Sequence, residues 1–213
     1  GRLSLERIGL IGRSFGGAST LVGLAMEPRF TAGFAVVPMA LLDQRPKLPP
    51  EALAPVGQES ALLAAQGDIA YTRLSKPTFL LSGAEDALII GLGKQQAVKA
   101  ETELPSGENP HPVLRALFED SDQPVFWGLL ANSNHSTLGV SGGYWWPDLK
   151  PNMAVRAFNP DVEFELLGAA LAHRMQQQKA LAFFDLTIRQ DPAARDAILS
   201  DSFAKQGLIV EAG

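Results

Sequence analysis

A serine near the start of the chain stands in a pattern that can make it a nucleophile. Residues 12–16 read Gly-Arg-Ser-Phe-Gly, between an apolar run at 8–11 and a helix-like segment at 18–26. A strand, Gly-x-Ser-x-Gly and a helix in succession are typical of a nucleophile elbow, the sharp turn that exposes a serine hydroxyl. We expect Gly12 and Gly16 to be required there, because a Cβ atom at either position would collide around the turn. The same spacing also occurs in purely structural turns and in loops that bind phosphate.

Ser14 needs a base to accept its proton, and that base needs an acid to orient it and stabilise its charged form. The chain has three histidines. His135 is the best candidate base, because it directly follows an apolar run at 125–130. His111 stands between prolines in a polar loop with no strand to position it. His173 lies within a helix-like segment, where a surface or helix-capping role is the expectation.

Two adjacent carboxylates, Glu85 and Asp86, follow the apolar run at 77–81 and are the candidate acids. Asp86 is favoured because its shorter side chain would hold an imidazole more rigidly. The order serine, acid, histidine along the chain also suits an α/β-hydrolase. A solvated loop carboxylate remains the alternative interpretation for both residues.

The apolar runs alternate with helix-like segments, which predicts an α/β fold. We expect buried strands at 5–12, 33–37, 77–81 and 125–130, and helices at 15–26, 93–103, 112–119 and 162–189. Strands that are apolar throughout indicate a mostly parallel sheet with helices on both faces. Side chains that do chemistry then gather in the loops beyond the carboxyl ends of the strands. Residues 38–75 are predicted to be a long loop or lid.

Composition narrows the class of protein further. The chain of 213 residues is 46% hydrophobic, which fits one globular domain with a substantial core. A net charge of −5 without a basic stripe argues against nucleic acid as a partner. The absence of cysteine excludes disulfides, thiolate metal sites and a cysteine nucleophile. No apolar run is long enough to span a membrane, and the compartment stays open.

Residues 7–18 resemble the elbow of α/β-hydrolases, and are most similar to platelet-activating-factor acetylhydrolase and dienelactone-hydrolase-like esterases, a lipase-like group that includes bacterial polyester hydrolases. Further short matches are residues 28–33 to the stretch after the elbow helix, 77–86 to the acid loop, and 134–136 to the base loop. The resemblance implies a serine carboxylic-ester hydrolase that works through an acyl-enzyme. It makes Ser14 the nucleophile, His135 the general base, Asp86 its orienting partner and the Phe15 backbone N–H an oxyanion donor. No cluster of His, Asp and Glu has metal-ligand spacing and no nucleotide-binding motif is present, so we expect no metal and no cofactor.

The chain departs from that pattern at three points. Arg13 stands where these relatives commonly have histidine, which alters the surroundings of the elbow but removes no catalytic atom. In the acetylhydrolase branch the acid follows the next strand, at about Val37 here, where no carboxylate stands. The family's sheet normally has several strands before the elbow. We therefore expect residues 1–213 to be the C-terminal part of one α/β-hydrolase domain, completed by a companion chain or an upstream segment.

The aromatic cluster Tyr144, Trp145 and Trp146 follows the candidate base in the sequence. It could form a wall for a small-molecule ester substrate, or pack within the fold. Two other functions remain open at this point. One is a non-catalytic, hydrolase-like interaction subunit, and the other is acyl transfer to an alcohol. The natural ester, its acyl-chain length and the second oxyanion donor are also left open.

Overall fold

The computed structural model describes residues 5–39, 74–139, 156–158, 161–162 and 165–213, and these contain one five-stranded sheet. The strands lie in sequence order: β1 (Ile8–Arg13), β2 (Phe30–Val36), β3 (Thr78–Gly83), β4 (Val125–Leu130) and β5 (Leu208–Ala212). The first four run parallel, and β5 pairs with β4 in the antiparallel direction. The helical elements are α1 (Phe15–Met26), α4 (Ala87–Ala100), α5 (Pro112–Glu119), α8 (Ala169–Thr187), α9 (Ala194–Leu199) and the 3₁₀ helix η4 (Asp201–Gln206).

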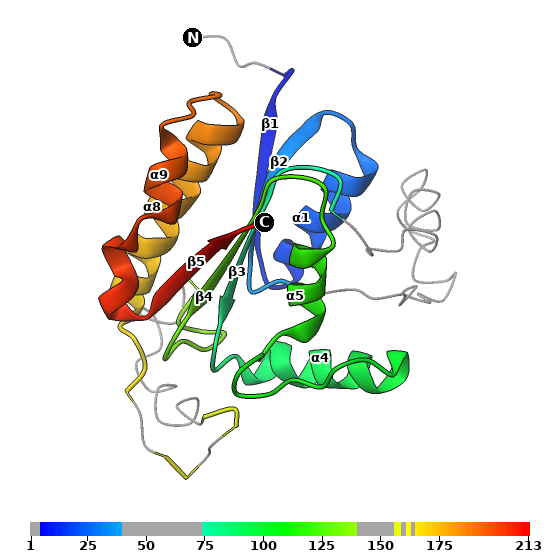
Figure 1. Ribbon diagram of the computed structural model, residues 1–213, viewed down its shortest axis with the longest axis vertical. Coiled ribbons are helices and arrows are strands. Elements are labelled where there is room, and N and C mark those ends of the chain that lie inside the picture. Colours follow the sequence, from blue (N-terminus) through cyan, green and yellow to red (C-terminus); the bar gives the residue numbers. More distant parts are fainter. Residues whose placement is uncertain (1–4, 40–73, 140–155, 159–160, 163–164) are drawn as a thin grey trace, which may run out of the picture.

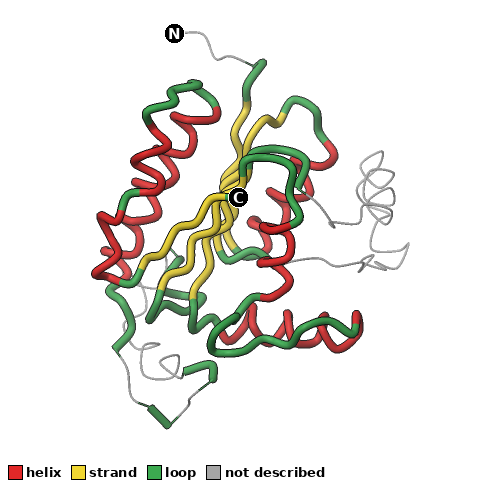
Figure 2. The backbone as a smooth tube through the Cα atoms, viewed as in Figure 1, coloured by secondary structure: helices red, strands yellow, loops and turns green. Residues whose placement is uncertain are grey.

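Helices cover both faces of the sheet, with α1 and α5 on one side and α8 and α9 on the other (Figure 1). The tube view shows the strands as the middle layer between them (Figure 2). Side chains alternate accordingly along each strand. Phe34, Phe79 and Phe126 surround Phe183 of α8, with ring centroids 6.0–6.1 Å from it. Trp127 belongs instead to the core on the α1 and α5 side.

The mostly parallel sheet with helices on both faces confirms the predicted α/β class. Several elements differ from the expectation. The predicted helix at 93–103 begins earlier, at Ala87, and the one at 162–189 is the shorter α8 (Ala169–Thr187). The elements α9, η4 and β5 were not predicted. The strand expected at 5–12 is β1, which is partly exposed instead of buried. Nearly all of the predicted loop or lid at 38–75 lies outside the described residues.

The parallel register brings the chemically interesting loops to one edge of the sheet. Arg13 pairs with Val36, and Val36 pairs with Leu81, near the carboxyl ends of β1, β2 and β3. Gly83 pairs with Leu130 at the ends of β3 and β4. The segments that follow β1, β3 and β4 therefore emerge side by side. Within the part of the chain that the structure describes, no helix is both long and apolar enough to cross a membrane.

Candidate active site

Ser14 occupies the turn between β1 and α1 in a backbone conformation that few residues adopt. Its φ is 58° and its ψ is −120°, and a non-glycine residue held in such a region costs about 1–3 kcal/mol. The turn is fixed by the Ser14 N–H, which donates to the Val36 carbonyl at 2.9 Å. The hydroxyl makes no capping hydrogen bond to α1. It is therefore available to a side chain from elsewhere.

Two glycines make this turn sterically possible. A Cβ at Gly12 would lie 2.0 Å from the Gly16 carbonyl oxygen and 2.7 Å from Thr20 Oγ1. A Cβ at Gly17 would lie 2.9 Å from the Val36 carbonyl oxygen. At Gly16 a Cβ would meet nothing within 4 Å. The requirement for glycine is thus confirmed at Gly12 and wrong at Gly16, because the crowded position on the helix side is Gly17.

The structure brings Ser14, His135 and Asp86 into one hydrogen-bonded chain. His135 Nε2 lies 2.9 Å from Ser14 Oγ, and His135 Nδ1 lies 2.8 Å from Asp86 Oδ2. A carboxylate oxygen can only accept, so Nδ1 carries the imidazole proton and Nε2 accepts from the serine hydroxyl. The histidine side chain is 15% exposed and the aspartate side chain 0%. This arrangement can withdraw a proton from Ser14 at the edge of solvent.

Asp86 is oriented by the helix that it begins. It is the N-cap of α4, and its Oδ1 accepts from the Ile89 N–H at 3.1 Å while Oδ2 faces His135. Each oxygen of the buried carboxylate therefore has its own donor. The neighbouring Glu85 accepts hydrogen bonds from the Ala157 N–H at 2.9 Å and from Arg156 Nη1 at 3.2 Å instead. Of the two candidate acids, Asp86 is the one placed against the imidazole.

Hydrogen bonds within the loop after β4 fix the backbone around His135. Asn134 Oδ1 accepts from the backbone N–H groups of Ser136 and Thr137, each at 3.0 Å. The Ser133 carbonyl accepts from the Glu85 N–H at 2.9 Å, which joins this loop to the acid turn after β3. The segments that carry the acid and the base are thus bound directly to each other.

Arg13 was not predicted to contact the base, yet its Nη2 donates to the backbone carbonyl of His135. Its position beside the elbow was visible in the sequence, but its side-chain partner was not. The hydrogen bond from the Ala157 N–H to the Glu85 carboxylate was not predicted either, because the two residues are far apart in the chain.

The other two histidines lie outside this hydrogen-bonded chain. His111 is buried, not in a polar loop as expected, and its Nε2 donates to the Gly83 carbonyl at 2.8 Å. Burial lowers the pKa of His111 below its ordinary value, although the Gly83 carbonyl and the charge of Asp86 oppose this shift. The ring lies edge-on to Trp127. His173 is within α8, as predicted.

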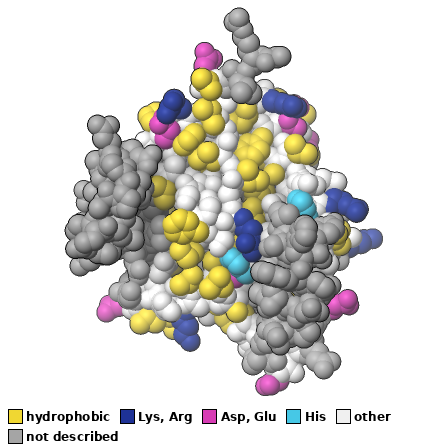
Figure 3. Space-filling model, turned by 180° about the vertical axis from the view of Figure 1, so that it is seen from behind, with side chains coloured by type: hydrophobic (Ala, Val, Ile, Leu, Met, Phe, Trp, Pro, Cys, Tyr) yellow, Lys and Arg dark blue, Asp and Glu magenta, His cyan; other side chains and the backbone are white. Residues whose placement is uncertain are grey.

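The surroundings of Ser14 combine polar and apolar groups. Phe15 begins α1, and its side chain is 73% exposed. The space-filling view shows hydrophobic side chains on one face, gathered beside a histidine and a basic side chain (Figure 3). Val37, where the acetylhydrolase branch has its acid, has a φ of 40° and carries no carboxylate. The aromatic cluster Tyr144, Trp145 and Trp146 lies outside the described residues.

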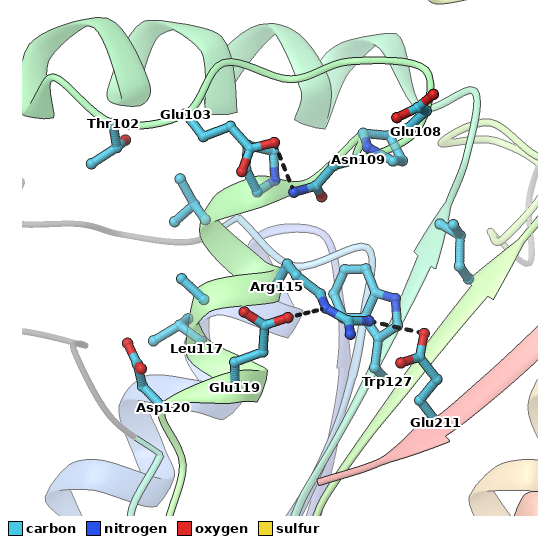
Figure 4. Close-up of a pocket in the computed structure, with 15 residues that line it drawn as sticks. Thr102, Glu103, Glu108, Asn109, Arg115, Leu117, Glu119, Asp120, Trp127 and Glu211 are labelled. Atoms are coloured by element: carbon cyan, nitrogen blue, oxygen red, sulfur yellow. Dashed lines mark hydrogen bonds and ion pairs between the residues drawn. The ribbon is translucent and has the colours of Figure 1, made fainter.

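A cavity of about 610 Å³ lies away from Ser14, beside α5 and β4. Figure 4 shows Arg115 there, between Glu119 and Glu211. Its Nε is 2.6 Å from Glu119 and its Nη1 is 2.9 Å from Glu211. Hydrogen bonds to Glu211 and Glu119 raise the pKa of Arg115. The cavity lining includes none of Ser14, Asp86 and His135.

No family model matches this chain, and no curated protein matches it. Among the described residues, no group of three or more histidine, aspartate or glutamate side chains could hold a metal ion.

Proposed function

We propose that this protein is a serine hydrolase of carboxylic esters, of the α/β-hydrolase type. The observation that carries the proposal is the continuous chain Ser14 Oγ, His135 Nε2, His135 Nδ1 and Asp86 Oδ2, with contacts of 2.9 and 2.8 Å. The strained backbone at Ser14, between a strand and a helix, supports it further. The resemblance of the elbow to platelet-activating-factor acetylhydrolase and dienelactone-hydrolase-like esterases points to the same chemistry.

The geometry suggests a two-step reaction. Ser14 Oγ attacks the ester carbonyl while His135 Nε2 accepts the hydroxyl proton, and Asp86 stabilises the resulting imidazolium. The imidazolium then protonates the departing alkoxide, which leaves as an alcohol, while the acyl group stays bonded to Ser14 Oγ as an acyl-enzyme. A water molecule attacks this acyl group, again losing its proton to His135. Return of that proton to Ser14 Oγ releases the carboxylic acid and restores the site.

The amino end of α1 is the proposed site of oxyanion stabilisation. The first N–H groups of a helix have no partner within the helix, and the helix dipole is positive at this end. Phe15 is the first residue of α1, so its N–H is well placed to donate to an oxygen bound to the carbon that Ser14 attacks. Each preorganised donor of this kind contributes roughly 2.7–4 kcal/mol to the transition state.

The outer edge of β1 supports the further proposal that another strand completes the sheet. In the described sheet β1 pairs only with β2, which leaves its other edge free to accept a strand. Apolar side chains are exposed in and beside it, with Ile11 at 55% and Leu5 at 72%. Such an edge is a template for pairing with another strand. A companion chain or an upstream segment would cover this edge and could supply the second oxyanion donor. A soluble, cooperatively unfolding and fully active monomer of residues 1–213 alone would contradict it.

Steady-state hydrolysis of short-chain p-nitrophenyl esters by the wild type and by Ser14→Ala tests the proposed activity. Wild-type turnover that falls by at least about 10³ on removal of the hydroxyl would agree with a serine nucleophile. Turnover that is unchanged in Ser14→Ala would overturn the proposal. It would favour a non-catalytic interaction subunit, for which the exposed edge of β1 is the supporting observation.

A further inference from the structure

Arg13 touches the loop that carries His135 at two places. It is the last residue of β1, and its Nη2 donates to the His135 carbonyl oxygen. The guanidinium also packs against the backbone of Gly139, where a Cβ would lie 2.7 Å from Arg13 Cζ and 2.8 Å from Nη2. The Arg13 side chain thus contacts this loop at two residues, His135 and Gly139.

Burial of the Arg13 guanidinium carries a desolvation cost. Arg13 Nε is buried and has no hydrogen-bond partner, and within the described residues Arg13 forms no ion pair. Burial lowers the pKa of Arg13 and the negative charge of Asp86 opposes this, but a guanidinium keeps its proton in proteins. A partly desolvated charge is costly unless it makes compensating interactions. Its main compensation in the structure is the contact with the His135 backbone and the charge of Asp86.

We propose that Arg13 is a positioning residue for His135, holding its backbone while Asp86 holds its ring. This inference rests on the proposed esterase function. Without the bond from Arg13, the His135 backbone would keep the Asn134 turn but lose its connection to the strand that carries Ser14. A small displacement of Nε2 from Ser14 Oγ is enough to matter, since misplacing a reacting group by about 1 Å can cost about 10²-fold in rate.

Three variants test the positioning role of Arg13. Arg13→Met removes both the charge and the donor, and Arg13→Lys keeps both without the planar fork. Gly139→Ala leaves Arg13 in the sequence but places a methyl group against its guanidinium. Arg7→Met is the matched control, because Arg7 is an exposed arginine that precedes β1. Each protein is assayed for kcat and KM with p-nitrophenyl acetate, and for its rate of inactivation by a fluorophosphonate.

We expect Arg13→Met to lower kcat and the inactivation rate about 10- to 100-fold with KM little changed. Arg13→Lys, which keeps a donor and the charge, should restore part of the rate. Gly139→Ala should lower the rate as Arg13→Met does, which covers the case in which Arg13→Met does not fold. Values of kcat and of the inactivation rate in Arg13→Met and Gly139→Ala that stay within twofold of those of wild type and of Arg7→Met would overturn the role of Arg13. A wild type that the fluorophosphonate does not label would instead overturn the proposed function, so the two failures are distinguishable.

Discussion

Replacement of Asp86 by asparagine should reverse the proton arrangement of the site while leaving the fold intact. In the wild type, Oδ1 accepts from the Ile89 N–H and Oδ2 accepts from His135 Nδ1. In Asp86→Asn the amide oxygen must remain on the Ile89 N–H, because an amide NH₂ cannot accept there. The NH₂ group then faces His135 and donates to Nδ1. The imidazole is forced to carry its proton on Nε2, where it can no longer accept a proton from Ser14.

The expected loss is about 10⁴ in kcat, as for the same change in a serine protease triad. That factor corresponds to about 5.4 kcal/mol of transition-state stabilisation. The unfolding free energy should fall by only about 1 kcal/mol, because the amide still caps α4 and still fills the buried site. Asp86→Ala should lose the activity and about 1 kcal/mol more of stability, since the helix cap is removed as well.

Ester hydrolysis and urea unfolding, measured on the same preparations, test this prediction. Glu85→Gln is the matched control, because Glu85 adjoins Asp86 but faces Arg156 and the Ala157 N–H instead of the imidazole. We expect it to keep kcat within a few-fold of wild type. A kcat for Asp86→Asn within tenfold of wild type, in a protein of normal stability, would refute the assignment of the imidazole tautomer and of Asp86 as its partner.

Other residues yield predictions that concern stability. Gly12→Ala should lower the unfolding free energy by about 1–3 kcal/mol or more, because its methyl group would lie 2.0 Å from the Gly16 carbonyl oxygen. Gly16→Ala should not lower it, because its methyl group would meet nothing within 4 Å. Urea unfolding of the two variants distinguishes these outcomes. Burial depresses the pKa of His111 in the folded state below its ordinary 6.5, so the unfolded chain binds more protons and stability should fall as the pH drops below about 6.5. His111→Gln, which can still donate to Gly83, should flatten that dependence, and an unchanged slope would contradict the assignment. Lys179 Nζ donates to the carbonyls of Ala197, Ile198 and Ser200 at 2.7–3.1 Å. Lys179→Met should therefore lower the free energy of unfolding, measured with urea or heat, by about 1–3 kcal/mol. An unchanged stability would contradict a stabilising role for these three hydrogen bonds.

The inner strands of the sheet could be predicted because they are almost entirely apolar and buried. Phe79 and Leu80 are neighbours in β3 and are both fully buried, one on each face. A strand covered on both faces therefore reads as a continuous apolar run, and glycine and proline mark its ends. The strand β5 was not predicted because it is an edge strand whose burial does not follow a simple pattern, and its Ile209 is 60% exposed. The short run Leu208–Ile209–Val210 was the signal available for it.

The positions of the candidate site residues followed from chain order, but their contacts did not. The rule that loops gather beyond the carboxyl ends of parallel strands placed Ser14, Asp86 and His135 at one edge. Sequence could only favour Asp86 over Glu85, because both carboxylates stand in the same loop. The decision depends on which of the two caps α4, and on Arg156 and Ala157, which lie far along the chain.

Arg13 illustrates a limit of a different kind. In the sequence it is a charged residue at an otherwise apolar elbow, with no neighbour that suggests its partner. Its role depends on the His135 carbonyl and on the absence of a side chain at Gly139. Contacts between a long side chain and a distant backbone carry no periodic pattern that a sequence could display.

Mass spectrometry of the protein after treatment with a fluorophosphonate tests directly whether Ser14 is a nucleophile activated by His135. We predict one phosphonyl group per chain on the peptide that contains Ser14. The labelling rate should fall at least about 10³-fold in His135→Ala, because the hydroxyl then has no base. Labelling should be absent in Ser14→Ala. No adduct at Ser14 in the folded wild-type protein, or equal labelling of the His135→Ala variant, would contradict a base-activated nucleophile at this site.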